Sequence, residues 1–327
     1  MSDVIAPKPN QGEPWDVAVV GSGPAGLTAA IYTTRGAAST LIIGGEKWGG
    51  QLMLTTEVDN FPGFPQGIMG PDLVANMKNQ AIRFGAEFMP SDVASVDFSK
   101  HPFKLMVNGQ WLTARSVIIA VGAVTKWLEV DGIEKLIGRG ISSCAPCDAP
   151  FFKNKKVAVV GGGDAAMEEA VVLTKYASEV FIIHRRSEFK ASAAMQKKVL
   201  DNPKIKILWN SEVIKLIGEQ KLEKIVIKNN QTNKEEELDL DGLFIAIGHK
   251  PESDIFKGVI EIDEKGYIKT MPNDKLQMMN GYQTAASVPG VFVSGDVHDY
   301  TYKQAVTAAG YGCQAALDCL KYLEDNN

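Results

Sequence analysis

Two segments of the chain share one order of apolar and glycine-rich stretches. The first segment has an apolar run at Asp16–Val20, a glycine turn at residues 21–26, a helical pattern at Leu27–Tyr32 and a second apolar run at Ser39–Ile43. Short apolar runs bounded by glycine are typical of buried strands. The first segment therefore predicts a strand, a tight turn, a helix and a second strand, which is a β-α-β unit.

The second segment repeats this order further along the chain. An apolar run at Lys156–Val160 leads into a glycine turn at residues 161–166, a helical pattern at Met167–Tyr176 and another apolar run at Glu179–Ile183. A glycine turn between a strand and a helix is the signature of a dinucleotide-binding unit. We therefore predict an α/β fold with two Rossmann-like dinucleotide-binding domains.

Two further apolar runs indicate how these domains are connected. Val117–Ala123 and Gly242–His249 are strand-like, end in similar glycine-containing sequences, and each follows one of the two units. We interpret them as the two crossings between an outer domain and an inserted one. The predicted inserted domain is 125–246, and the outer domain is discontinuous, formed by 1–124 and 247–327.

Composition is that of an ordinary globular protein. The 327 residues are 45% hydrophobic and 22% charged, and the net charge of -5 argues against nucleic-acid binding. Residues 1–15 lack an apolar core of signal-peptide length, and the uncharged run at residues 17–34 is interrupted by glycine and Pro24. We expect a cytoplasmic protein with neither a membrane nor a nucleic-acid partner.

The first glycine turn has the residues that a pyrophosphate site requires. The N-terminus of the following helix presents unpaired N–H groups to an anion. Gly21 permits the tight turn, Gly23 allows the backbone to approach the phosphates, and Gly26 allows close packing of helix and strand. The acidic candidate for a ribose hydroxyl is Glu46, slightly further along than usual.

The second turn is followed by positive charge instead of an acidic residue. His184, Arg185 and Arg186 come directly at the end of the next strand, and Lys190 follows. Guanidinium groups match phosphate oxygens, so this cluster favours the 2′-phosphate of NADP over the free hydroxyl of NAD. The residues predicted to contact NADPH are Gly161, Gly163, Asp164, Ala165, His184, Arg185, Arg186 and Lys190.

The four cysteines fall into two pairs. Cys313 and Cys319 are six residues apart in a helical pattern and so face different sides of it, which predicts that they do not pair. Cys144 and Cys147 form a C-x-x-C motif. Zinc requires two further ligands, and the chain has only four histidines and no second C-x-x-C motif, so we favour a redox-active disulfide. The neighbouring Asp148 is placed to protonate a departing thiolate.

The C-terminal region supplies a third element. The apolar run Val291–Asp296 ends in Gly-Asp, and a helical pattern runs from Lys303 to about Tyr322. Two nucleotide sites in one chain imply electron transfer between two cofactors, usually a tightly held flavin and an exchangeable nicotinamide. If a flavin is bound, Asp296 can accept hydrogen bonds from its hydroxyls, and the helix N-terminus can stabilise negative charge on the reduced ring.

Taken together, these motifs resemble the low-molecular-weight thioredoxin reductases. The resemblance extends from Asp16 to about Tyr322. The segments that carry it are Gly21–Gly26, Gly49–Leu52, Thr55–Gly63, Cys144–Asp148, Gly161–Asp164, His184–Arg186, Ala246–His249, Gly295–Val297 and Gln304–Gly310.

The resemblance implies an FAD/NAD(P)-binding flavoprotein fold of three layers (ββα), FAD and NADPH as cofactors, a homodimer, and thioredoxin as protein substrate. It also implies that Cys147 faces the flavin, that Cys144 attacks the disulfide of thioredoxin, and that Asp148 is the acid/base. The predicted FAD contacts are Gly21, Gly23, Pro24, Ala25, Glu46, Gly50, Gln51, Leu52, Asn60, Gly122, Gly295, Asp296, Lys303, Gln304 and Ala305.

The chain departs from the family pattern in several places. Ala149-Pro150 replaces the usual glycine after the aspartate, Ala165 lacks the usual hydroxyl, and Lys190 replaces an arginine. Residues 270–286 form a longer segment to which we assign no function. Two alternatives remain open, namely a related flavin disulfide reductase with another protein acceptor and a non-catalytic flavin redox sensor.

Both nicotinamide and disulfide are predicted to lie in the inserted domain, although each must reach one flavin in the outer domain. We therefore expect the inserted domain to rotate about the crossings near Ala123 and Gly248.

Overall fold

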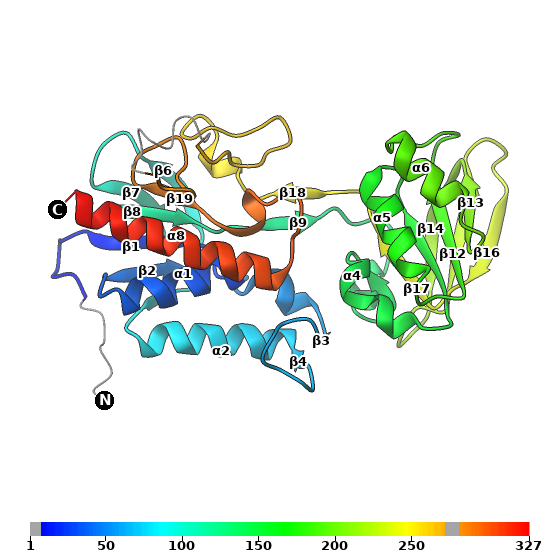
Figure 1. The fold of residues 1–327 in the computed structure, drawn as a ribbon, viewed down its shortest axis with the longest axis horizontal. Helices are drawn as coiled ribbons and strands as arrows, with labels where there is room; N and C mark the ends of the chain where they lie inside the picture. Colours follow the sequence, from blue (N-terminus) through cyan, green and yellow to red (C-terminus); the bar gives the residue numbers. More distant parts are fainter. Residues whose placement is uncertain (1–7, 272–280, 327) are drawn as a thin grey trace. The chain divides into compact units, whose positions relative to one another are not determined.

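The computed structural model describes residues 8–271 and 281–326; most of the 270–286 segment lies outside these ranges. The chain divides into two compact units (Figure 1), residues 1–124 with 250–327, called here the outer unit, and residues 125–249, called the inserted unit. In the described part of the chain, no helix combines the length and apolarity needed to cross a membrane.

The outer unit is built on a largely parallel sheet. Its parallel strands lie in the order β5, β2, β1, β8 and β19, and an antiparallel extension of β7 and β6 pairs with the first half of β8. The strands are β1 (Trp15–Val20), β2 (Thr40–Ile43), β5 (Glu87–Met89), β6 (Val93–Asp97), β7 (Phe103–Val107), β8 (Gln110–Ile119) and β19 (Val291–Val293). The helices of this unit are α1 (Pro24–Arg35), α2 (Gly70–Arg83) and α8 (Ala305–Asp325).

Both faces of this sheet are buried, as its continuous apolar strands require. Val17 and Val19 of β1 point to a helical layer, in which α1 packs on α2 and α8. Ala18 and Val20 point to the opposite face, where they meet a second apolar cluster that includes Phe256. Short elements complete the unit: η1 (Gly50–Leu54), β3 (Glu57–Val58), β4 (Ile68–Met69), η3 (Asp254–Phe256) and η5 (Gly295–Val297).

The inserted unit repeats this architecture on a smaller scale. Five parallel strands lie in the order β10, β17, β11, β12 and β13, and an antiparallel sheet of β14, β15 and β16 forms another layer. The strands are β10 (Ile141–Ser142), β11 (Lys156–Val160), β12 (Glu179–His184), β13 (Ile205–Trp209), β14 (Ser211–Ile217), β15 (Lys224–Asn229), β16 (Glu235–Asp239) and β17 (Gly242–Ile245). The helices are α3 (Ile133–Leu136), α4 (Ala145–Asp148), η2 (Ala149–Phe152), α5 (Asp164–Leu173) and α6 (Ala193–Leu200).

Alternate residues of the parallel strands again face opposite layers. Val157 and Val159 pack with α4 and α5, whereas Ala158 and Val160 pack against the antiparallel sheet. Each unit therefore has a helical layer, a parallel sheet and a further β-containing layer. The predicted α/β fold with two Rossmann-like ββα units is confirmed.

The two crossings differ from the single strands that we predicted. β8 ends at Ile119, and a separate β9 (Ala123–Thr125) follows; β17 ends at Ile245, and β18 (His249–Pro251) follows. Gly122 and Gly248 have φ of +74° and +107°, values that break a strand. β9 and β18 pair with each other as a two-stranded sheet.

The helix boundaries also differ from the prediction. α1 spans Pro24–Arg35 instead of Leu27–Tyr32, α5 spans Asp164–Leu173 instead of Met167–Tyr176, and α8 begins at Ala305 instead of Lys303. Lys303 has a φ of +50°, which is not helical, and Gln304 is the N-cap residue of α8.

Two of the helical glycines, Gly26 and Gly310, provide a matched test of close packing. A Cβ on Gly26 would lie 2.2 Å from the carbonyl oxygen of Gly21, whereas a Cβ on Gly310 would meet nothing within 4 Å. Gly26→Ala should lower the free energy of unfolding by about 3 kcal/mol, because a backbone atom must move. Gly310→Ala should raise it by up to about 1 kcal/mol. Urea titration measures both, and equal effects would contradict the packing role of Gly26.

Candidate functional site

The glycine turn of the outer unit connects β1 to α1. Gly21 has a φ of +114°, and a Cβ there would lie 2.2 Å from the carbonyl oxygen of Ala120. Gly23 is the N-cap of α1, has no side chain to cap the helix, and has nothing within 4 Å of where a Cβ would be. The turn is therefore closed at Gly21 and open at Gly23, next to the free N–H groups of the helix, as an approaching pyrophosphate requires.

Segments from distant parts of the sequence meet at this turn. The Ser22 hydroxyl donates to the carbonyl of Gly44 at 2.6 Å and accepts the N–H of Gly49 at 2.9 Å. A Cβ on Gly50 would lie 3.4 Å from the Cα of Gly23, and one on Gly295 would lie 2.8 Å from the Cβ of Ala25. The predicted FAD residues in the first turn, η1 and η5 are thus close neighbours, with Gln51 and Leu52 in η1 itself.

The end of β2 carries the acidic candidate for the ribose. The backbone N–H of Glu46 donates to the Asp92 carboxylate at 3.1 Å, and the side chain of Glu46 is exposed. Its contact with a ribose hydroxyl stays a prediction, as do the individual contacts of Pro24, Gly122, Lys303 and Ala305.

Buried polar atoms mark the place where β19 ends. Ser294 Oγ and Asp296 Oδ1 are enclosed, and neither finds a hydrogen-bond partner among the described residues. Burial and the neighbouring Asp299 raise the pKa of Asp296 to about 6. Buried polar atoms are normally satisfied, so these two oxygens indicate a polar ligand. The hydroxyl-bearing chain of a flavin nucleotide fits them, because its hydroxyls can donate to Asp296.

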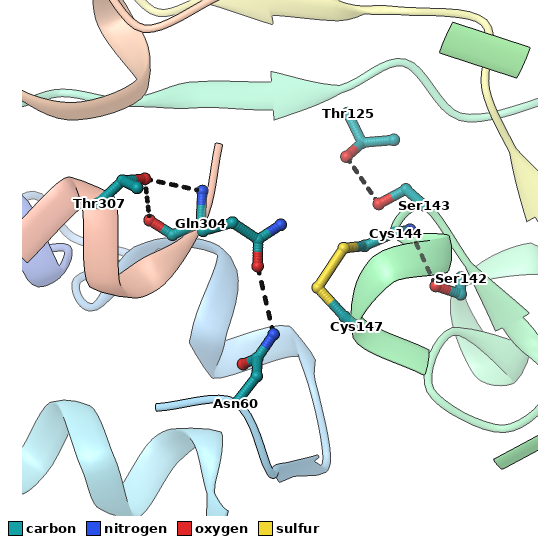
Figure 2. The surroundings of a disulfide bond; sticks show 8 residues. All are labelled: Asn60, Thr125, Ser142, Ser143, Cys144, Cys147, Gln304 and Thr307. Carbon is teal, nitrogen blue, oxygen red and sulfur yellow. Dashed lines mark hydrogen bonds between the residues drawn. A yellow bond between two sulfur atoms is a disulfide. The ribbon is translucent and has the colours of Figure 1, made fainter. Parts of the chain in front are cut away.

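The start of α8 is tied to the loop that contains Asn60. The backbone N–H of Gln304 donates to the Thr307 hydroxyl at 3.2 Å, and this bond is part of a capping box. The same hydroxyl donates to the Gln304 carbonyl at 2.9 Å (Figure 2). The Asn60 amide donates to Gln304 Oε1 at 3.2 Å. These two predicted FAD residues, 244 positions apart in sequence, therefore meet at the N-terminus of one helix.

The glycine turn of the inserted unit has the same closed and open positions. A Cβ on Gly161 would lie 2.6 Å from the carbonyl oxygen of Ala246, and one on Gly162 would lie 2.1 Å from the His184 ring. Gly163 has nothing within 4 Å. This turn also fits a pyrophosphate over the N-terminus of its helix, α5.

The basic cluster after β12 is held against this turn by three hydrogen bonds. The backbone N–H of Lys190 donates to the Gly162 carbonyl at 2.8 Å. The Asp164 carboxylate accepts the N–H of Ser192 at 2.9 Å and its hydroxyl at 2.7 Å, bonds that lower the pKa of Asp164. The buried His184 ring pairs with the Glu188 carbonyl at 2.9 Å.

These bonds divide the predicted NADPH residues into two groups. Arg185, Arg186 and Lys190 are exposed and available to an anion. His184 and Asp164 are engaged within the protein and tether the loop that carries the exposed cations. Direct contacts of the predicted residues with NADPH, including Ala165 on α5, stay predictions.

Cys144 and Cys147 form a disulfide, with their Cα atoms 5.3 Å apart (Figure 2). Cys144 is the N-cap residue of α4, and its backbone N–H donates to the Ser142 hydroxyl at 3.0 Å. Both cysteines are half-buried. Cys313 and Cys319 are free thiols, as predicted, and buried Cys319 donates to the Ser116 hydroxyl. Among the described residues, no three His, Cys, Asp or Glu side chains are grouped as metal ligands.

The carboxyl group that follows the disulfide is set apart by its burial. Burial raises the pKa of Asp148, and a hydrogen bond with Ser142 opposes that rise. A carboxyl with a raised pKa can hold a proton closer to neutral pH and give it to a thiolate. The predicted acid therefore has the environment that its chemistry needs.

Sequence reasoning missed two residues near the disulfide. Glu169 is on α5, with Oε2 enclosed. It shares the helix face of the fully buried Ala166 and Leu173, so an acid within an apolar helical stripe was a signal available in the sequence. Phe151 is 43% exposed, four residues after Cys147, next to the exposed Pro150.

Comparisons with known proteins agree with this geometry. Residues 15–312 match the family model described as pyridine nucleotide-disulphide oxidoreductase. The chain is 47% identical over 311 residues to a thioredoxin reductase of Streptomyces clavuligerus, with 94% of each protein covered.

Solved structures give the same result. The thioredoxin reductase of Giardia duodenalis is 40% identical, with a TM-score of 0.88 over 95% of this chain and 99% of that one. The thioredoxin reductase of Streptococcus pyogenes is 34% identical, with a TM-score of 0.88 over 95% and 98%.

Proposed function

Because this chain belongs to the pyridine nucleotide-disulphide oxidoreductases, and within them to the thioredoxin reductases, we propose that it reduces the disulfide of thioredoxin with electrons from NADPH. The observation that carries the proposal is the Cys144–Cys147 disulfide followed by the half-buried acid Asp148, in the unit that also holds a basic cluster at its glycine turn. FAD is assigned to the outer unit and NADPH to the inserted unit. A homodimer is part of the same proposal.

In the outer unit, the residues that would hold FAD are those around the first glycine turn. The α1 N-terminus and Gly23 would face the pyrophosphate, and Asp296 would accept hydrogen bonds from hydroxyls. In the inserted unit, Gly163 would face the second pyrophosphate, and Arg185 and Arg186 would bind the 2′-phosphate. When bound, these cofactors supply a hydride and relay its two electrons to a disulfide.

The protein's own residues then carry out thiol–disulfide exchange. Once Cys144 and Cys147 are reduced, the Cys144 thiolate attacks one sulfur of the thioredoxin disulfide, and a mixed disulfide forms as the first thioredoxin thiolate leaves. Asp148 protonates a departing thiolate. Cys147 then attacks the Cys144 sulfur, which releases the second thioredoxin thiolate and restores the Cys144–Cys147 disulfide.

A partner protein needs an accessible surface beside Cys144. Pro146 and Pro150 are exposed on either side of Cys147, and Phe151 is exposed as well. An exposed aromatic ring with two rigid prolines is suited to protein docking, since little side-chain entropy is lost when they are covered.

Replacing one cysteine separates the two half-reactions. Cys144→Ser and Cys147→Ser should each abolish thioredoxin reduction, because disulfide exchange requires both sulfurs. Flavin reduction by NADPH should persist in both variants, since it does not use the cysteines. Stopped-flow flavin absorbance and an insulin-coupled thioredoxin assay measure the two steps. Cys313→Ser is the matched control and should keep full activity; thioredoxin turnover in either C-x-x-C variant would refute the proposed role.

The basic cluster predicts the choice of nicotinamide cofactor. Replacing Arg185 and Arg186 together by Ala should lower kcat/KM with NADPH about tenfold or more and leave the value with NADH unchanged, because only NADPH has the 2′-phosphate. The control replaces the exposed Lys197 and Lys198 of α6 by Ala and removes the same charge elsewhere in the inserted unit. An equal decrease of kcat/KM with NADPH and with NADH would contradict the proposed contact of Arg185 and Arg186 with the 2′-phosphate.

We further propose that the inserted unit rotates about β9 and β18 between half-reactions. Disulfide and nicotinamide have to reach one flavin in turn, and Cys144 must then reach thioredoxin, which a single rigid arrangement hardly permits. One cysteine is added to each unit, and the two are joined by a non-reducible linker. The linked protein should complete one half-reaction but should not sustain steady-state turnover. The same variant without linker is the control, and full turnover after linking would rule out the rotation.

A further inference from the structure

Glu169 is an enclosed carboxyl group that the exchange mechanism above does not use. It lies on α5, which packs against α4, the helix that carries the disulfide. Small residues of these elements lie in one apolar cluster: Ala145 of α4, Ala149 at the start of η2, and Ala166 and Ala170 of α5 are at most 1% exposed. Alanines allow two helices to approach closely, and across this contact Glu169 lies near enough to Asp148 for the negative charge of Asp148 to act on it.

The surroundings of Glu169 do not suit a negative charge. Its Oε2 is enclosed and accepts no hydrogen bond from the described residues. Burial, and in second place the charge of Asp148, raise the pKa of Glu169 to about 8. A protonated carboxyl can instead donate to a neighbouring carboxylate.

The other charged groups on α5 and on the elements packed against it are either exposed or paired with other residues. On α5 itself Asp164 and Glu168 are exposed, as are Lys156 of β11 and both lysines of α6. On β12, Glu179 pairs with Lys206, and His184 pairs with the Glu188 carbonyl. No charged side chain lies within α4 or η2 except Asp148.

We propose that Glu169 is a positioning residue that holds a proton behind Asp148 and returns it after Asp148 has protonated a thiolate. The proton moves from the Glu169 carboxyl to the Asp148 carboxylate, and Glu169 is re-protonated from solvent before the next cycle. The two carboxyl groups act as one coupled pair. This inference rests on the proposed function for its catalytic consequence, but the coupled pair itself can be tested without turnover.

The test without turnover uses stability as a function of pH. A carboxyl that stays protonated in the folded protein and ionises in the unfolded chain makes stability fall as pH rises from its ordinary pKa towards about 8. The urea midpoint of the native protein should therefore decrease more between pH 5 and pH 8 than that of Glu169→Gln. Gln is neutral and of the same shape, so this variant should fold. Glu212→Gln, an exposed acid in the same unit, should follow the native curve.

The catalytic test compares thioredoxin reduction at different pH values. At low pH Asp148 is protonated directly from solvent, so Glu169→Gln should match the native kcat. Towards pH 8 the kcat of the variant should be about tenfold below the native kcat. The decrease of kcat on the alkaline side of the pH profile therefore begins at a lower pH in the variant. Flavin reduction by NADPH should not change, whereas a merely structural defect would lower kcat equally at every pH.

The outcomes are distinct. Parallel urea curves for the native protein and Glu169→Gln would overturn the coupled pair. If the urea midpoints of the two proteins diverge with pH but their kcat values depend on pH in the same way, the transfer of a proton from Glu169 to Asp148 is overturned. Absence of thioredoxin reduction in the native protein would refute the proposed function and leave the urea comparison standing as the test of the pair.

Discussion

At each glycine turn a backbone carbonyl oxygen lies where a Cβ would otherwise be. The Ala120 oxygen is 2.2 Å from that position at Gly21, and the Ala246 oxygen is 2.6 Å from it at Gly161. These close approaches bring the carboxyl end of a central strand directly beneath the N-terminus of a helix. The unpaired N–H groups of the helix are then presented at the sheet edge, and the phosphate-binding geometry of both units depends on that constraint.

The two units use this common frame for different purposes. In the outer unit, the turn gathers η1, η5 and the start of α8, and leaves Asp296 and Ser294 with oxygens that the described part of the protein does not satisfy. In the inserted unit, the turn is covered by the His184 ring and by a basic loop. Unsatisfied acceptors favour a ligand rich in hydroxyls, and exposed cations favour an additional phosphate, so one fold can select two nucleotides.

Burial decides how the acids near the disulfide behave. Asp148 and Glu169 are both carboxyl groups on helices of the inserted unit, and in both the pKa is raised because charge is poorly solvated there. Asp164, on the same helix as Glu169, is exposed and bonded to Ser192, which lowers its pKa. Three acids of one unit thus have three different environments: Asp148 follows the disulfide, Glu169 has an enclosed oxygen, and Asp164 is bonded to the loop that carries the basic cluster.

The sequence by itself determined the two β-α-β units, the C-x-x-C pair and the unpaired state of Cys313 and Cys319, because each rests on local spacing and hydrophobic period. It predicted the crossings only approximately, since the positive φ of Gly122 and Gly248 interrupts an apolar run that otherwise looks continuous. Only the tertiary structure decided that Asp164 binds Ser192, that Asn60 meets Gln304 and that Glu169 lies enclosed behind α4. Such pairings join residues far apart in the chain, and the burial that sets a carboxyl's charge exists only once the layers have packed.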